Sequence, residues 1–154
     1  KRSELDKGVI AASAGNHAQG LAMAAKKIGA TATIVMPTTT PLIKVNAVRS
    51  LGAEVVLVGD NYDQASAYAT QLVIEKDMTY IHPFDDPDVI AGQGTTGLEI
   101  ARQAAALGVT EAEVIVCCGG GGLTSGIALA LASEAPAMRV RPAEPEGFDD
   151  ATRS

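Results

Sequence analysis

The chain has no tryptophan, and only three of its 154 residues are tyrosine and two are phenylalanine. It therefore has few aromatic platforms on which the bases of single-stranded nucleic acid could stack. Basic residues are scarce as well, because twelve lysines and arginines stand against eighteen acids and give a formal net charge of −6. Nucleic-acid binding needs a basic footprint for the phosphates. The composition therefore predicts that nucleic acid is not a partner.

Long apolar runs are also missing, since no run approaches the roughly 20 residues of a membrane-spanning helix. The chain does not open on the basic and apolar segments of a secretion signal. Its only cysteines, Cys117 and Cys118, are adjacent, which suits neither a disulfide nor a metal site. Hydrophobic residues make up 47% of the chain, which is enough for a core. We expect a cytoplasmic protein with no membrane association and no metal ion.

Short runs rich in β-branched residues alternate with longer runs of helical periodicity. The expected strands are residues 8–12, 31–36, 54–58, 79–82, 113–118 and 138–143. The expected helices carry apolar residues on one face, as in the set Ala18, Leu21, Ala22, Ala25 and Ile28. Strands that alternate with helices of this length predict an α/β fold with open, mostly parallel sheets and flanking helices.

The segment HPFDDP at 82–87 interrupts this alternation with two prolines and two acids. It predicts a boundary between a small lobe, residues 1–85, and part of a larger lobe, residues 86–154. The second lobe has too few elements for a complete core of its own. We therefore expect it to be completed by the remainder of the same polypeptide or by another copy in a homo-oligomer.

Four consecutive glycines, Gly119 to Gly122, connect an expected strand to a helix that starts near Leu123. Because glycine has no side chain, such a loop can bring several backbone N–H groups to one point at the positive end of the helix. This arrangement predicts a binding site for an anion, most simply a phosphate. The flanking sequence is of the buried type on both sides, which does not fit a flexible linker.

The phosphate could belong to a dinucleotide, because Glu144 follows the next strand, where a ribose-binding acid is found in such folds. The glycine spacing is imperfect, since Ser125 stands in place of a third glycine or alanine. A literal GxGxxG match at residues 92–97 follows a loop instead of a strand. We interpret that match as accidental, and Gly94 and Gly97 as positions of close helix packing.

A second loop, Ser13-Ala14-Gly15-Asn16-His17, lies between an apolar strand and an alanine-rich helix. At such a turn free N–H groups point into a crevice beyond the sheet, and here a hydroxyl and an amide accompany them. Ser13 or Asn16 could instead serve only as a helix N-cap. His17 has no acid near it in sequence, so a hydrogen-bonded structural role is favoured over that of a base.

Four ordered motifs together resemble the threonine/serine dehydratase (ammonia-lyase) group of the fold type II pyridoxal-phosphate enzymes. They are SAGNHAQG at 13–20, IVMP at 34–37, VIAGQGT at 89–95 and the tetraglycine loop. The resemblance implies pyridoxal 5'-phosphate as cofactor and an amino acid of the L-threonine or L-serine type as substrate, converted to a 2-oxoacid and ammonia. The alternative from the residues alone is a Rossmann-like nucleotide-binding module without catalysis.

The resemblance also implies roles for the two loops. Ser13 and the backbone of Gly15, Asn16 and His17 would hold the substrate carboxylate, and Asn16 would bond the phenolic oxygen of the cofactor. Ala14 stands where serine racemases carry a serine that moves a proton, which favours elimination over racemisation. The backbone of Gly119, Gly120, Gly121, Gly122 and Leu123 would hold the cofactor phosphate.

The family's Schiff-base lysine lies in a motif upstream of the loop at residues 13–17, called the asparagine loop below, and no such motif precedes Ser13 here. Lys1 and Lys7 stand too close to the loop to replace it, and the other lysines are expected on the surface. The resemblance therefore implies that the chain contains no catalytic residue. It would be the central part of a longer enzyme and inactive by itself.

Overall fold

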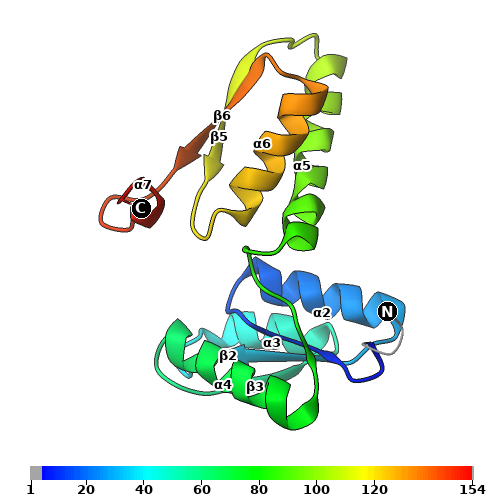
Figure 1. Cartoon of the computed structure of the whole chain (residues 1–154), viewed down its shortest axis with the longest axis vertical. Helices are drawn as coiled ribbons and strands as arrows, with labels where there is room; N and C mark the ends of the chain where they lie inside the picture. The colour runs from blue at the N-terminus through cyan, green and yellow to red at the C-terminus, as the bar shows by residue number, and fades with distance from the viewer. Residues whose placement is uncertain (1–4, 154) are drawn as a thin grey trace. The chain divides into compact units, whose positions relative to one another are not determined.

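The computed structural model describes residues 5–153, and these divide into two compact units, one up to Pro83 and one from Phe84 onward (Figure 1). The division lies close to the boundary predicted after residue 85. No helix in the described part of the chain is long and apolar enough to cross a membrane.

The first unit is built on a four-stranded sheet in the order β3-β2-β1-β4, with every neighbouring pair parallel. Its strands are β1 (Val9–Ala12), β2 (Ala32–Met36), β3 (Glu54–Leu57) and β4 (Thr79–Tyr80). Its helices are α2 (Asn16–Ile28), α3 (Leu42–Ser50) and α4 (Tyr62–Lys76). The strand expected over 79–82 is shorter than predicted, because Pro83 has no N–H with which to continue the ladder.

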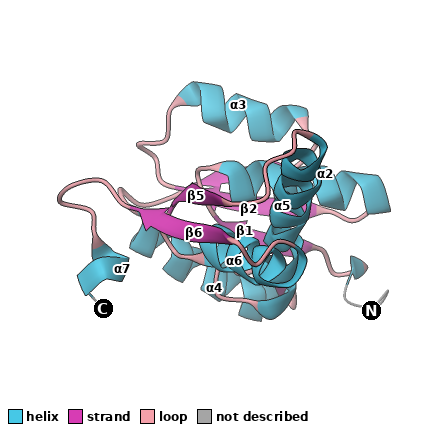
Figure 2. Cartoon of the chain, turned by 90° about the horizontal axis from the view of Figure 1, so that it is seen from above, coloured by secondary structure: helices cyan, strands magenta, loops and turns pink. Residues whose placement is uncertain are grey.

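Helices cover both faces of this sheet (Figure 2). Helices α2 and α3 pack on the face of Val9 and Ala11, and α4 packs on the face of Ile10 and Ala12. Burial on both faces explains why β1 is an uninterrupted apolar run. The predicted face of α2 is wrong at its last member, since Ile28 is 59% exposed. The helix ends there at Gly29, which has a left-handed φ of 73°.

The strand order reverses beside β1. The chain builds outward from β1 through β2 to β3 and then returns to place β4 on the other side of β1. In open α/β sheets, ligands bind outside the carboxyl ends of the strands at such a reversal. The loop that leaves the carboxyl end of β1 is Ser13–Gly15, so the asparagine loop occupies this position.

The second unit contains the parallel pair β5 (Ala112–Cys117) and β6 (Met138–Ala143). Its helices are α5 (Pro87–Ala106), α6 (Gly122–Glu134) and the short α7 (Asp150–Arg153), with α5 and α6 side by side (Figure 1). Its core is small and gathers around four buried side chains, Val116, Ile127, Leu131 and Met138. Both units thus confirm the predicted class of parallel sheets with flanking helices.

Glycines bring α5 and α6 into backbone contact. A Cβ added to Gly126 of α6 would lie 2.6 Å from the backbone nitrogen of Gly94 in α5, and one added to Gly97 would lie 2.9 Å from the Ile127 carbonyl oxygen. The GxGxxG match at 92–97 lies inside α5, away from any strand end. The interpretation of Gly94 and Gly97 as positions of close helix packing is confirmed.

Candidate functional site

The asparagine loop leaves the start of α2 without a side-chain cap. Gly15 occupies the N-cap position, no described side chain accepts a hydrogen bond from the first turn, and that turn carries no acid. The Ser13 hydroxyl oxygen accepts a hydrogen bond from the Gly15 N–H at 3.2 Å. Asn16 lies one residue inside the helix, exposed to solvent. Neither Ser13 nor Asn16 is therefore the N-cap, which was the structural alternative for both.

The tetraglycine loop ends in the same way at α6. Gly121 is the N-cap, with a left-handed φ of 83°, and among the described residues no side chain caps the first turn and no acid stands in it. The Thr124 hydroxyl donates to the Cys117 carbonyl at 3.3 Å, which ties the first turn of the helix to the end of β5.

Two other helices, α4 and α5, begin with a side-chain N-cap and carry an acid in the first turn. The Asn61 side chain caps α4 by accepting from the Gln64 N–H at 3.0 Å, and Asp63 stands in the first turn. The Asp86 carboxylate caps α5 by accepting from the N–H groups of Asp88 and Val89. Helix α3, which follows Pro41, also begins without a described side-chain cap.

These helix N-termini differ in how well they can bind an anionic ligand. A free first turn offers unbonded N–H groups and the positive end of the helix dipole, both of which favour an anion. An acid in the first turn, as in α4 and α5, already supplies negative charge there. Each candidate loop therefore leads into a 13-residue helix whose N-terminus suits a phosphate or a carboxylate.

The imidazole of His17 is bonded to the backbone of the first unit. Its Nε2 atom lies 3.2 Å from the Ile81 carbonyl oxygen, which can only accept, so Nε2 carries the proton. Burial lowers the pKa of His17, the bond to Ile81 opposes this shift, and nearby His82 lowers the pKa further. His17 is therefore a neutral donor that links the start of α2 to the chain after β4, in agreement with the structural role favoured from sequence.

This environment predicts a pH-dependent stability for the chain. Because the folded pKa of His17 is lowered, the unfolded chain takes up a proton first as the pH falls through about 6.5, the ordinary histidine value, and stability is lost from that point downward. Glutamine at this position keeps an N–H donor and does not titrate. We expect the wild type to lose free energy of unfolding relative to His17→Gln between pH 7.5 and about 5.5. Urea unfolding at several pH values measures this difference, and parallel pH profiles of the two proteins would refute it.

Glu144 was a candidate ribose-binding acid from its place in the sequence, but in the structure its carboxylate is hydrogen-bonded to residues of α7. Its carboxylate accepts hydrogen bonds from the backbone N–H groups of Ala151 and Thr152, at 2.8 and 3.0 Å, and from the Thr152 hydroxyl at 2.7 Å. These bonds lower its pKa and hold the start of α7. The nucleotide-binding alternative thereby loses the acid on which it rested.

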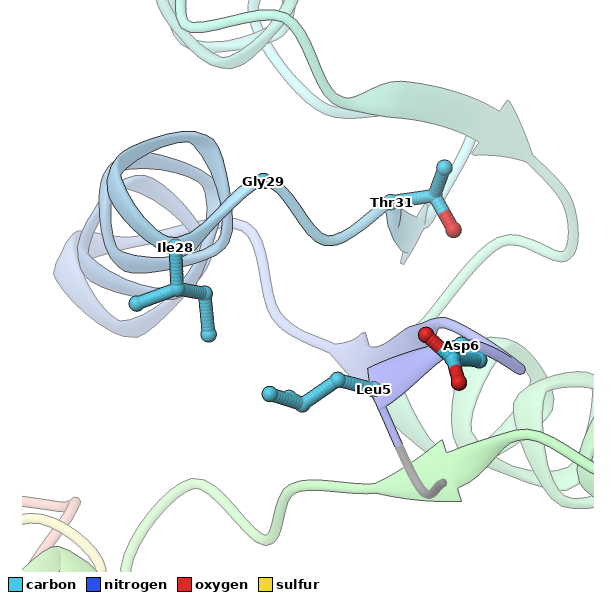
Figure 3. Close-up of a pocket in the computed structure, with 5 residues that line it drawn as sticks. All are labelled: Leu5, Asp6, Ile28, Gly29 and Thr31. Carbon is cyan, nitrogen blue, oxygen red and sulfur yellow. The ribbon is translucent and has the colours of Figure 1, made fainter. Parts of the chain in front are cut away.

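A hollow of about 510 Å³ lies elsewhere in the first unit (Figure 3). Its lining residues are Leu5, Asp6, Ile28, Gly29 and Thr31. They come from the segments just before β1 and β2 and from the end of α2, so the hollow lies at the amino ends of the strands. The asparagine loop follows the carboxyl end of β1, and the hollow is therefore separate from the candidate site.

The lysines of the chain lie as expected from the sequence. Lys7 forms an ion pair with Asp77, and Lys26, Lys27, Lys44 and Lys76 are exposed. Lys1 lies outside the described residues.

The predicted site residues divide between the two units. Ser13 to His17 belong to the first, and Gly119 to Leu123 belong to the second. A family model described as pyridoxal-phosphate dependent enzyme matches residues 1–154. The chain belongs to this family. The expected cofactor, pyridoxal phosphate, is the one on which the family depends.

Curated relatives within the family are close in sequence. The chain is 56% identical over 142 residues to the chloroplastic biosynthetic threonine dehydratase of Arabidopsis thaliana, and 54% identical over 133 residues to the biosynthetic L-threonine dehydratase of Haemophilus influenzae. These alignments cover 92% and 86% of this chain. The chain spans about a quarter of the length of these relatives, 24% and 25%.

Solved structures of the family superpose on the whole chain. Threonine deaminase isoform 2 of Solanum lycopersicum, in its processed form, gives a TM-score of 0.90 at 49% identity and covers all of this chain and 44% of its own. Maize serine racemase gives a TM-score of 0.91 at 35% identity, with 46% of its own chain covered. The expected resemblance to fold type II pyridoxal-phosphate enzymes is confirmed.

Proposed function

We propose that the protein containing this chain is a pyridoxal-phosphate-dependent dehydratase, or ammonia-lyase, which converts L-threonine or L-serine type hydroxy amino acids to a 2-oxoacid and ammonia. One observation carries the proposal: two strand-to-helix loops, one in each unit, lead into helices without side-chain caps and without acids in the described first turns. The names of the threonine dehydratase relatives support the choice of reaction.

The tetraglycine loop fits the phosphate group of the cofactor. A Cβ added to Gly119 or Gly121 would meet no described atom within 4 Å, so there is open space beside both of these glycines. The N–H groups of Gly119 to Gly122 and of Leu123 would hold the phosphate, as the positive end of α6 favours. When bound, pyridoxal phosphate supplies an electron sink that stabilises negative charge at the substrate Cα.

The asparagine loop fits the polar groups of the substrate and of the cofactor ring. The Ser13 hydroxyl still has its proton to donate to a carboxylate, since the bond from Gly15 uses only its oxygen. The N–H of Gly15 is already engaged in that bond, so the free donors of the turn are the N–H groups of Asn16 and His17. The Asn16 amide would donate to the phenolic oxygen of the cofactor. Ala14 beside them has no proton to transfer, which favours elimination.

The two units would be the small lobe and part of the large lobe of such an enzyme. Ile115 on β5 is 75% exposed, whereas parallel strands are ordinarily covered on both faces. This exposure supports the prediction that more of the polypeptide, or a second copy in a homo-oligomer, completes the second unit. Placement in the cytoplasm stays a prediction, and the name of the Arabidopsis relative places that protein in the chloroplast.

The proposal is tested on the full-length protein reconstituted with pyridoxal phosphate. We expect the visible absorbance of protein-bound cofactor and the release of 2-oxobutyrate from L-threonine or pyruvate from L-serine. D-serine, followed by chiral chromatography, should not form at a comparable rate. A protein that binds the cofactor but forms neither 2-oxoacid would refute the proposed reaction, and one that binds no cofactor would refute the site.

A further inference from the structure

Phe84 lies directly against the tetraglycine loop within the second unit. A Cβ added to Gly120 would overlap the Phe84 ring and approach its Cδ2 atom to 2.7 Å. A Cβ added to Gly122 would lie 2.9 Å from both the Cα and the carbonyl oxygen of Phe84. Two of the four glycines are therefore required by Phe84, independently of any ligand.

The loop has few other means of holding its shape. Four glycines carry no side chains for packing and lose more conformational entropy on ordering than other residues. The described bonds near the loop lie at its two ends. At the strand end the Cys118 N–H donates to the Ala143 carbonyl and the Cys118 thiol to the Gly119 carbonyl. At the helical end the Thr124 hydroxyl donates to the Cys117 carbonyl and the Ser125 N–H to the Gly121 carbonyl. The contact with Phe84 reaches the middle of the loop, where these bonds do not.

Phe84 lies just before the start of α5 in the chain. Asp86 caps that helix two residues later, and Pro87 occupies its first turn. Helix α5 in turn makes backbone contact with α6 through Gly126. The ring, the loop, α5 and α6 thus pack in one continuous arrangement, and the N-terminus of α6 would face the cofactor phosphate.

Filling the hydrophobic core does not account for this placement. The core of the second unit gathers around Ile127 and Leu131, and Phe84 is not among the side chains described as packing against it. Phe84 is half-buried, and it occupies the space into which side chains at positions 120 and 122 would project.

We infer that Phe84 is a positioning residue for the cofactor phosphate. Its ring covers one side of the tetraglycine loop and holds the backbone so that the N–H groups of residues 119–123 converge on the other side. The inference rests on the proposed function of this loop. It assigns Gly120 and Gly122 to contact with Phe84, and Gly121 to the left-handed turn that starts α6.

The test compares two cofactor forms that differ only in the phosphate. Dissociation constants of pyridoxal phosphate and of pyridoxal are measured by absorbance titration for the full-length wild type, Phe84→Leu and Phe84→Ala. We expect Phe84→Ala to weaken pyridoxal phosphate binding about tenfold or more, because the loop must then be ordered on binding, with pyridoxal binding changed less than about twofold. For Phe84→Leu the dissociation constant of pyridoxal phosphate should lie between those of the wild type and Phe84→Ala. The control is Phe148→Ala, since Phe148, the other phenylalanine, is 74% exposed.

The possible outcomes distinguish a failure of the inference about Phe84 from a failure of the proposed function. Equal weakening of both cofactor forms, or no weakening of either, would overturn the inference about Phe84. A wild type that binds neither form would instead overturn the proposed function. If Phe84→Ala does not fold, Phe84→Leu decides alone, because it keeps an apolar side chain and loses the ring.

A double-mutant cycle adds a readout of the contact itself. Gly120→Ala should weaken pyridoxal phosphate binding strongly beside Phe84, because the added methyl overlaps the ring, and less beside alanine at 84. Additive effects would show that the two residues act separately and would contradict the inference.

Discussion

Gly126→Ala lowers the free energy of unfolding of the chain by about 3 kcal/mol, the upper end of what overpacking ordinarily costs. The added Cβ would overlap the Ile90 carbonyl oxygen and lie 2.6 Å from the Gly94 nitrogen and 2.9 Å from the Gln93 carbonyl carbon. These are backbone atoms inside α5, so they cannot rotate away as a side chain would. Helices α5 and α6 must therefore separate, which opens the packing of the second unit. Urea unfolding followed by circular dichroism measures the loss.

Gly92→Ala is the matched control, and its effect has the opposite sign. Gly92 lies in α5, exposed, and a Cβ there would meet no described atom within 4 Å. Alanine at this position should raise the free energy of unfolding by about 0.5–1 kcal/mol, because glycine is the poorer helix former. Equal effects of the two substitutions would contradict the described packing of α5 on α6.

Replacing two asparagines should separate ligand binding from helix capping. Asn16→Ala removes an exposed amide that has no hydrogen-bond partner within the described residues, so the free energy of unfolding should change by less than about 0.5 kcal/mol. In the full-length enzyme the rate of 2-oxoacid formation should fall about tenfold to a hundredfold, as expected for a lost hydrogen bond to a charged oxygen. Enzyme assay and urea unfolding are measured on the same preparations.

Asn61→Ala should show the reverse pattern. Its side chain caps α4 by accepting from the Gln64 N–H, and loss of such a cap costs about 1 kcal/mol of stability. Asn61 belongs to neither candidate loop, so the rate should stay within about twofold of the wild type at a temperature where the variant is folded. If Asn16→Ala destabilised the chain and left the rate intact, Asn16 would be structural and its proposed contact with the cofactor wrong.

Strands β1 and β2 could be predicted from the sequence because each is a short, fully buried run that contains β-branched residues. Burial on both faces of the parallel sheet removes the polar alternation that a half-exposed strand would show. Ile28 was placed wrongly because its spacing fits the buried stripe, while the helix ends at the next residue. The periodicity of the sequence predicts on which face of a helix a residue lies, but it does not predict where along the helix the contact with the sheet ends.

The candidate loops were also predictable, since glycines and small polar residues between a strand and a helix are unusual. What the sequence left open was the partner of each group. The bonds from Ser13 to Gly15 and from His17 to Ile81 depend on how the turn and β4 fold. The sequence showed Phe84 only as part of the boundary segment HPFDDP and gave no sign of its role, because its contact with Gly120 joins residues 36 positions apart in the chain.

The central claim is that the uncapped start of α6 holds the cofactor phosphate. It is tested most directly by a crystal structure of the full-length protein with pyridoxal phosphate bound. Phosphate oxygens within hydrogen-bonding distance, about 2.7–3.2 Å, of the N–H groups of Gly119 to Leu123 are the predicted result. A phosphate held by other residues, with the tetraglycine loop turned away from it, would contradict the account.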